Sequence, residues 1–194
     1  DVQYKIPSMR TKFYSTVFID ELSITNLLKG KNLSAVAFTL GGVIDDPVIQ
    51  NSSFAIEYTR LNPFVYMNSD PVHLYSNHGY QLGHWIGSNA DQFYAAYNQH
   101  ILPQLKFNVK MNFVRKGKTE FPEEQYQLPY PEFLYGARLS QLLVDFSIRY
   151  EIIHDLVADA YYQYSKTEDE EIGRLLEFVK GSKNSFGLKI YYGL

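Results

Sequence analysis

Residues 184–194 read NSFGLKIYYGL, and from Phe186 onward every second residue is apolar. In an extended strand, successive side chains point to opposite faces. One face therefore holds Phe186, Leu188, Ile190, Tyr192 and Leu194, and the other holds Gly187, Lys189, Tyr191 and Gly193. A two-faced strand at the C-terminal end is typical of the closing strand of a transmembrane β-barrel, with one face toward lipid and one toward a polar lumen.

The same alternation recurs along the chain. Residues 105–113 show it most clearly, and nine residues are about enough to cross a bilayer at a tilt. Segments 36–41, 54–59, 93–98, 144–150 and 155–165 alternate in the same way, and 12–19 is strand-like with an ambiguous facing. With the terminal strand, these segments predict eight strands.

The connections between these segments are short and long in turn. The short ones are 44–52, 100–104 and 151–154, and the long ones are 20–32, 61–91, 116–137 and 166–183. Outer-membrane barrels have short periplasmic turns and long extracellular loops. We therefore predict an all-β, antiparallel, up-and-down transmembrane β-barrel in the bacterial outer membrane. Residues 1–194 form a single barrel domain or the C-terminal portion of one.

A soluble antiparallel sandwich or small barrel shows the same period, with the apolar face packed inward. The length of the strands argues against it, because soluble strands average about five or six residues. Tyrosines also gather near the predicted strand ends, as expected at a membrane surface. In the barrel, seven polar side chains are predicted to face the lumen: Glu57, Lys106, Lys110, Asp145, Arg149, Asp159 and Lys189.

Composition narrows the functional classes. The net charge of −3 gives no broad basic surface, so no nucleic-acid partner is expected. The chain has no Cys, which excludes disulfides and Cys-ligated metals. It has 17 Tyr and 13 Phe, and these amphipathic or apolar rings suit interfaces.

No catalytic constellation stands out, so we predict a protein that is not an enzyme and has no catalytic residues, cofactor or metal. His73, His78 and His84 lie in one long loop, but their irregular spacing favours loop hydrogen bonding over a metal site. The acids at 168–171 favour a helix N-terminus, so a short amphipathic helix is predicted across residues 172–179. These acids are interpreted as solvated rather than calcium-binding. Gly41 and Gly42 predict a bend or close packing within a strand.

The long loop at 61–91 is rich in aromatic residues, which disordered segments lack. Its Tyr, Trp, His, Asn and Asp side chains suit carbohydrate, because sugar rings stack on aromatic faces and sugar hydroxyls bind amides and carboxylates. Alternatively, the loop folds into the barrel mouth as a plug whose side chains satisfy one another. The two interpretations are compatible.

The stretch EYTRLNPFVY at 57–66, SDP at 69–71, and LGHWIGSNAD at 82–91 resemble the C-terminal part of Wzi-like capsule assembly proteins of Bacteroidetes-type bacteria. FIDE at 18–21 and the terminal YYGL fit the same resemblance. It implies an outer-membrane barrel that binds capsular polysaccharide as a lectin. It also implies a longer parent barrel, so this chain closes on itself, pairs with other chains, or is an excised segment.

The leading hypothesis is a lectin-like barrel involved in binding, attachment or assembly of capsular or other surface polysaccharide. Its expected partners are that polysaccharide, outer-membrane lipid and other outer-membrane proteins. The alternatives are a structural barrel subunit of a multi-protein complex, a diffusion channel, or a glycan-cleaving enzyme that uses Asp70 and Asp91. The predicted glycan-binding residues are Tyr66, Asp70, Tyr75, Asn77, Tyr80, His84, Trp85 and Asn89.

Overall fold

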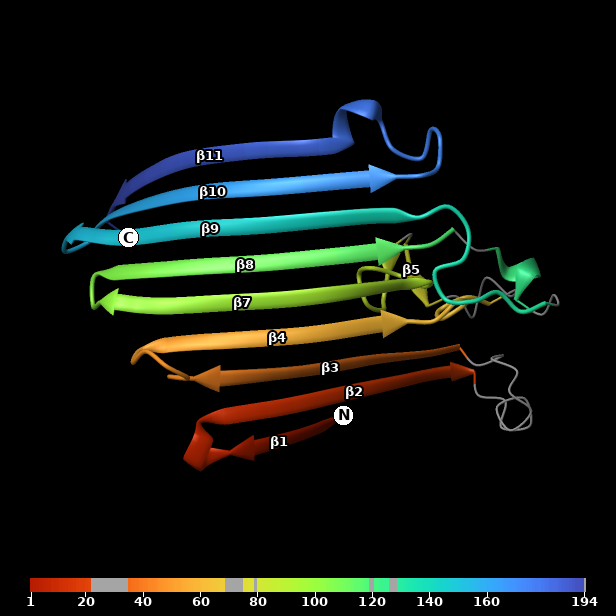
Figure 1. Ribbon diagram of the computed structural model, residues 1–194, viewed down its shortest axis with the longest axis horizontal. Coiled ribbons are helices and arrows are strands. Elements are labelled where there is room, and N and C mark those ends of the chain that lie inside the picture. Colours follow the sequence, from red (N-terminus) through yellow and green to blue (C-terminus); the bar gives the residue numbers. More distant parts are fainter. Residues whose placement is uncertain (22–34, 69–74, 79, 119–120, 126–128, 194) are drawn as a thin grey trace.

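Nine strands, each hydrogen-bonded to its neighbours in chain order, form one antiparallel sheet in the computed structural model (Figure 1). The structure describes residues 1–21, 35–68, 75–78, 80–118, 121–125 and 129–193. The strands are β1 (Val2–Ile6), β2 (Thr11–Glu21), β3 (Ala35–Asp45), β4 (Ser52–Leu61), β7 (Ala90–Leu102), β8 (Leu105–Lys116), β9 (Leu139–Ile153), β10 (Leu156–Asp169) and β11 (Gly181–Tyr192). The predicted all-β, up-and-down antiparallel architecture is confirmed.

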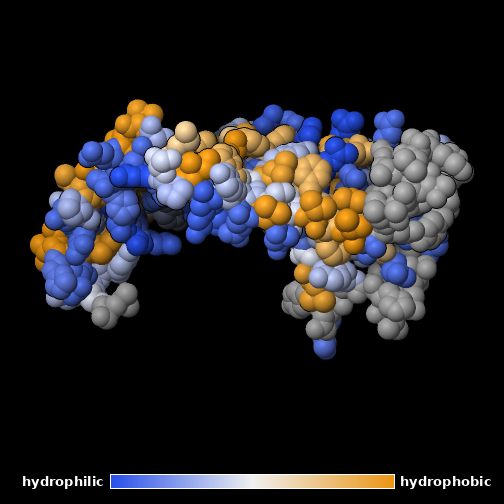
Figure 2. Space-filling model, turned by 90° about the horizontal axis from the view of Figure 1, so that it is seen from below, coloured by the Kyte–Doolittle hydropathy of each residue, from blue (hydrophilic) through white to orange (hydrophobic). Residues whose placement is uncertain are grey.

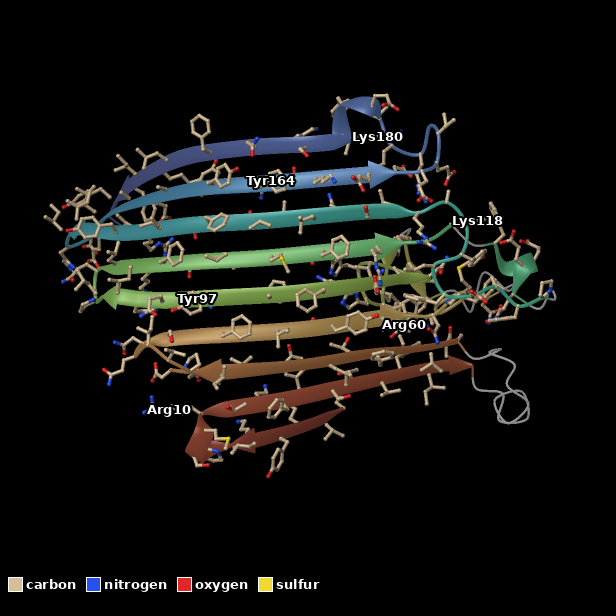
Figure 3. All side chains as sticks on the ribbon, viewed as in Figure 1. Arg10, Arg60, Tyr97, Lys118, Tyr164 and Lys180 are labelled. Carbon is tan, nitrogen blue, oxygen red and sulfur yellow. The ribbon has the colours of Figure 1, made fainter. Side chains whose placement is uncertain are left out.

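The two ends of the sheet differ in their connections, as predicted (Figure 1). At the short-turn end, the strands are joined by tight turns and by the 3-10 turn η1 (Pro7–Met9). At the long-loop end lie the extended connections, which include a small hairpin of β5 (Ser76–Asn77) and β6 (Tyr80–Gln81), and the 3-10 turn η3 (Pro122–Glu124). In Figure 3, Arg10 and Tyr97 lie toward the short-turn end, whereas Arg60, Lys118 and Lys180 lie toward the long-loop end.

Strand β1 was not predicted, and the sheet it begins is open. Val2, Tyr4 and Ile6 alternate with Gln3 and Lys5, but five residues are too few for a firm periodic signal. Among the described strands, β1 pairs only with β2, and β11 pairs only with β10. These strands do not close into a barrel, so closure stays a prediction.

The sheet register separates a polar face from an apolar face. On the polar face of β8 lie Lys106, Asn108, Lys110 and Asn112, and the opposite side carries Phe107, Val109 and Met111. Along β11 the apolar side chains are 62–86% exposed: Phe186, Leu188, Ile190 and Tyr192. No described part of the chain covers this face, although an exposed apolar surface of this size needs an apolar neighbour.

Two glycines on the polar face lie beneath tyrosine rings of the adjacent strand. Gly41 pairs with Tyr14, and Gly187 pairs with Tyr161. A Cβ atom at either glycine would overlap the tyrosine ring. The close packing predicted at 41–42 is therefore confirmed at Gly41, where only a residue without a side chain lets the ring lie flat on the strand.

The buried core lies on the polar face at the long-loop end. It comprises Ala35, Ala37, Leu61, Val65, Ile86, Ala90 and Val114. Five of these belong to strands β3, β4, β7 and β8, and Val65 and Ile86 come from the connection between β4 and β7. The edge-on view of Figure 2 shows the molecule hollowed along one side, with hydrophilic atoms bordering much of the hollow. No helix in the described residues is both long and apolar enough for a membrane span.

The predicted helix across 172–179 is wrong, because only the 3-10 turn η4 (Glu177–Val179) forms there. Gly173 has a φ of 85°, which a right-handed helix does not permit, and Ile172 points into solvent instead of covering the sheet. The preceding acids are also not uniformly solvated. The side chain of Asp169 is fully buried and forms an ion pair with Arg174.

Candidate functional site

The connection between β4 and β7 turns back over the polar face. We call its described residues between Asn62 and Asn89 the plug segment. The Asn62 N–H donates to the Val36 carbonyl over 3.1 Å, and the Asn89 N–H donates to the Asn62 carbonyl over 3.3 Å, so the two ends of the segment meet. Farther in, the Tyr66 N–H donates to Asp20 Oδ2 over 2.8 Å. These bonds hold the segment against the sheet, and its role as a plug in a barrel mouth stays a prediction.

Two aromatic residues of the plug segment have positive φ angles. Phe64 has a φ of 62° and Tyr66 a φ of 71°, a region that residues with a Cβ rarely adopt. Phe64 is fully buried, and its ring centroid lies 5.7 Å from that of Tyr130. Packing around these two residues therefore maintains a backbone shape that costs about 1–3 kcal/mol per residue.

An aromatic stack forms where the plug segment meets β2. The rings of Tyr66 and Tyr75 are stacked at 5.2 Å with an interplanar angle of 15°, and Phe18 lies 5.1 Å and 5.7 Å from them. Gly83 lies beneath the Tyr66 ring, where a Cβ atom would overlap it. Tyr75 is 44% exposed. The stack is thus fixed on one side and open to solvent on the other.

His84 and Trp85 continue this aromatic surface. The His84 N–H donates to the Tyr66 hydroxyl over 3.2 Å, and the His84 and Trp85 rings are stacked at 6.2 Å with an angle of 29°. Trp85 is 61% exposed, whereas His84 is half-buried. An exposed indole beside an anchored imidazole offers a flat apolar face next to polar atoms.

A cavity of about 110 Å³ lies beneath Tyr66 and His84. Thr16, Thr39 and Thr59 contribute hydroxyl groups to its wall, and the Thr39 and Thr59 hydroxyls are 2.9 Å apart. The cavity is small for a sugar ring, and its lining is mainly apolar apart from the threonine hydroxyls. The open side of the aromatic surface is therefore the part that can meet a larger ligand.

Asn89 is fully buried and does not face solvent. Its Oδ1 accepts the Leu134 N–H over 2.8 Å, and its Nδ2 donates to the carbonyls of Lys118 and Tyr135 over 3.3 and 3.4 Å. Asn89 thus joins the β4–β7 connection to the β8–β9 connection at the long-loop end, and its position supports the loops rather than a direct ligand contact.

The other predicted glycan-binding residues are only partly described. Asp70 lies outside the described residues. Asn77 and Tyr80 pair with each other in the β5–β6 hairpin, but the positions of their side chains are not described. The structure therefore brings together Tyr66, Tyr75, His84 and Trp85 from the predicted set.

The seven predicted lumen residues all lie on the polar face of the sheet. Glu57 accepts the Tyr14 hydroxyl over 2.5 Å near the plug segment. The other six lie on β8–β11, where Arg149 pairs with Asp159 and Gln163 donates to Asp145 over 2.6 Å. Lys106, Arg149, Asp159 and Lys189 are cross-strand neighbours near the short-turn end, away from the aromatic surface.

The acid pair of the enzyme alternative stays a prediction, because Asp70 lies outside the described residues. No group of three His, Asp or Glu side chains among the described residues could hold a metal ion, and His73 lies outside them. Asp91 is buried and paired with Arg115, whose Nε lies 3.0 Å from Asp91 Oδ1. It faces the side of the sheet opposite the plug segment.

Three residues that hold the plug segment had no recognised role in the sequence. Asp20 accepts the Tyr66 N–H, Phe18 packs against the aromatic stack, and Lys116 Nζ donates to the Ile86 carbonyl over 2.8 Å. In the sequence, Asp20 stood out only as part of the FIDE stretch at 18–21. Its contact joins positions 46 residues apart, which local spacing does not reveal.

Residues 47–173 match the family described as capsule assembly protein Wzi, and this range exceeds half of the chain. The chain belongs to the Wzi capsule assembly family. The match includes the whole plug segment and strands β4 to β10, so the aromatic surface lies in the family region. The comparisons with curated proteins and with solved structures give no match. The family resemblance predicted from the sequence is confirmed, and its narrower assignment to Bacteroidetes-type members stays a prediction.

In this Wzi-family chain, the plug segment is expected to loosen at acid pH. Burial lowers the pKa of His84 from its ordinary 6.5, and the charge of Glu57 offsets part of that effect. Its Nδ1 also accepts the Ile86 N–H over 3.4 Å, which only the unprotonated nitrogen can do. Because the folded pKa is below the unfolded one, the stability from neutral His84 is complete above about pH 6.5 and falls as pH drops below it.

Protease sensitivity of the plug segment at pH 7.5 and pH 5 measures this effect. The wild-type segment should be cut faster at pH 5, and His84→Gln should remove most of the pH dependence. A pH dependence that is identical in the two proteins would assign it to another group.

Proposed function

We propose that this chain forms the wall and mouth of an outer-membrane β-barrel that binds capsular or other surface polysaccharide without catalysis. Membership of a capsule assembly family supports the biological setting. The carrying observation is the open aromatic surface of Tyr75, His84 and Trp85, held on the polar face by the plug segment. Each step of the proposal has its own support.

The uncovered apolar face supports a location in the membrane. Strands β7 to β11 contain 12–15 residues, more than the roughly 9–11 that a tilted strand needs to cross a bilayer. Their exposed apolar side chains would meet hydrocarbon, while the long loops extend beyond it on one side. Recovery of the native protein in the soluble fraction of lysed cells would contradict this part of the proposal.

The aromatic surface supports a carbohydrate ligand. A sugar ring can stack its C–H face on the exposed Trp85 indole, while its hydroxyl groups bond to polar atoms nearby. The stack beneath is held by Tyr66, whose hydroxyl accepts the His84 N–H and whose own N–H is bound by Asp20. A fixed surface loses little conformational entropy on binding, which favours affinity for a flexible polymer.

Trp85→Ala is expected to weaken binding of the organism's own surface polysaccharide about tenfold, by removing one stacking contact worth about 1.4 kcal/mol. Isothermal titration of the detergent-solubilised protein measures the change. Trp85→Phe should retain part of the affinity, because a smaller aromatic face remains.

Phe121→Ala is the matched control for this prediction. Phe121 is also exposed at the long-loop end, at 56%, but lies outside the plug segment. Its removal should leave the affinity within about twofold of wild type. A twofold change corresponds to about 0.4 kcal/mol of binding free energy, which is small beside the loss of one stacking contact. Equal affinities of wild type and Trp85→Ala, with the fold intact by circular dichroism, would remove Trp85 from the site.

A further inference from the structure

A row of charged side chains crosses β8 to β11 on the polar face near the short-turn end. The register pairs Lys106 with Arg149, Arg149 with Asp159, and Asp159 with Lys189. Lys110 lies on the same face of β8, nearer the middle of the sheet. Four cations and one carboxylate therefore line the same part of the polar face.

This charged row borders a cavity of about 400 Å³. Asn98, Asn108 and Ser147 lie in the lining between the charged side chains. The Asn98 and Asn108 amide nitrogens donate to Ser53 and Ser147, and these two bonds do not use the acceptor capacity of the amide oxygens. The site thus combines cations with groups that bind hydroxyls.

The only carboxylate in the lining is already neutralised. Arg149 Nε and Nη2 lie 2.8 and 2.9 Å from the two oxygens of Asp159, and the Tyr191 hydroxyl donates to Asp159 over 3.2 Å. A bidentate pair of this kind satisfies both charges. Arg149 and Asp159 together therefore contribute little net charge to the cavity.

Three lysines remain without a carboxylate partner among the described residues: Lys106, Lys110 and Lys189. Asp145, the cross-strand neighbour of Lys110, accepts from the neutral amide of Gln163 over 2.6 Å and lies outside the cavity lining, where its negative charge offsets only one of the three lysines. The Lys189 ammonium lies 5.5 Å from the centre of the Tyr161 ring. The cavity therefore carries an excess of positive charge, which attracts anions.

The spacing of the lysines favours an extended anion. Lys106 and Lys110 are four residues apart on one strand, about 14 Å, and Lys106 and Lys189 are three strands apart, again about 14 Å. These are separations of the backbone, and the flexible lysine side chains extend from it into one cavity. A chain with several acidic groups can contact all three lysines at once, with one acidic group at each.

We propose that this cavity binds a segment of an acidic oligosaccharide, whose carboxylates pair with Lys106, Lys110 and Lys189. Sugar hydroxyls bond to Asn98, Asn108 and Ser147. The inference rests on the proposed function, which supplies polysaccharide as the class of ligand. It adds a second binding site for that polymer, at the end of the polar face opposite the plug segment. A polysaccharide chain bound at Trp85 and at this cavity would run along the strands.

An oligogalacturonate of defined length tests this proposal, with a maltooligosaccharide of the same length as its uncharged counterpart. Isothermal titration uses the full chain in detergent. Lys106→Gln/Lys110→Gln should bind oligogalacturonate about tenfold more weakly and with less salt dependence, because two exposed ion pairs are lost. Inorganic phosphate should bind wild type far more weakly than the oligosaccharide does.

Lys5→Gln/Lys12→Gln is the matched control. Both lysines lie on the polar face of β1 and β2, away from the cavity, and their removal changes the net charge equally. The control should bind oligogalacturonate within about twofold of wild type. Equal losses in the two double variants, equal binding of the uncharged oligosaccharide, or phosphate binding as tight as the oligosaccharide would each overturn the proposal.

Trp85 is the single Trp of the chain, so its fluorescence reports binding at the aromatic surface and not at the cavity. This distinguishes the inference from the proposed function. If oligogalacturonate does not bind while native polysaccharide still changes Trp85 fluorescence, only the cavity proposal fails. If oligogalacturonate binding persists while native polysaccharide neither binds nor changes Trp85 fluorescence, the proposed function fails and the cavity remains. Circular dichroism of each variant shows whether the sheet is intact.

Discussion

Asn89→Ala should release the long-loop end of the structure and lower its local free energy of unfolding by about 3 kcal/mol. The substitution removes the side-chain bonds to Leu134, Lys118 and Tyr135, and leaves buried backbone groups without partners. Asn89 also has a φ of 52°, which Ala adopts less readily than Asn. The lost hydrogen bonds and the unfavourable φ both lower the stability of the Ala variant.

Hydrogen exchange of the Leu134 amide measures this prediction, because that N–H donates to Asn89 Oδ1. Exchange should accelerate by about two orders of magnitude, as 3 kcal/mol implies. Asn89→Gly removes the same side-chain bonds but tolerates the positive φ, so it should be less destabilising than Ala. Unchanged protection of Leu134 in Asn89→Ala would show that the side chain does not hold the loops.

Arg174→Gln should detach the connection between β10 and β11, at a cost of about 3 kcal/mol. The side chain of Arg174 is only 16% exposed, and the side chain of Asp169 is fully buried. Arg174 Nε donates to Asp169 Oδ1 over 3.0 Å, and its Nη1 donates to the carbonyls of Gly117 and Ala137 over 3.4 and 3.5 Å. Removing the guanidinium leaves a buried carboxylate without its cation.

Protease cleavage between residues 170 and 180 reports this detachment. Arg138→Gln is the control, because Arg138 has the same charge at the same end but is exposed. Asp169→Asn in the Arg174→Gln background should restore part of the lost stability, since it removes the unpaired charge. Equal cleavage rates in Arg174→Gln and Arg138→Gln would contradict the prediction.

Strand periodicity was sufficient to predict most of the sheet. In β8, each polar residue from Lys106 to Asn112 is followed by an apolar one, and the register keeps each kind on its own face. Periodicity did not reveal β1, because its five residues form a strand only through pairing with β2. Short strands depend on their neighbours more than on their own sequence.

The error at residues 172–179 has a local cause. Ile172, Leu175, Leu176 and Val179 have helical spacing, but Gly173 adopts a positive φ and Arg174 bonds backward to Asp169. A side-chain bond to a preceding strand offers the backbone an alternative to the helix. The apolar spacing was genuine, but it was outweighed by an ion pair that the spacing could not show.

The candidate site was predicted by composition and not by geometry. The aromatic richness of the loop indicated an ordered plug, and Tyr66, Tyr75, His84 and Trp85 do come together. Side-chain direction in an irregular loop has no period, so the burial of Asn89 was not foreseeable. The role of Asp20 in holding Tyr66 likewise depends on a contact between distant segments.

The neighbour-by-neighbour strand order has a consequence for how the protein is made. Each of the nine strands pairs with the strand next to it in the sheet as the chain proceeds, so the hairpins can be added one after another without long-range searching. The plug segment, in contrast, depends on contacts with later parts of the chain. The side-chain bonds of Asn89 need Leu134 and Tyr135, and the bond to the Gly117 carbonyl needs Arg174. Strands β4 to β8 can therefore be paired before these loop contacts form. The connections at the long-loop end can therefore become rigid only after β10, which precedes Arg174 in the chain, has entered the sheet.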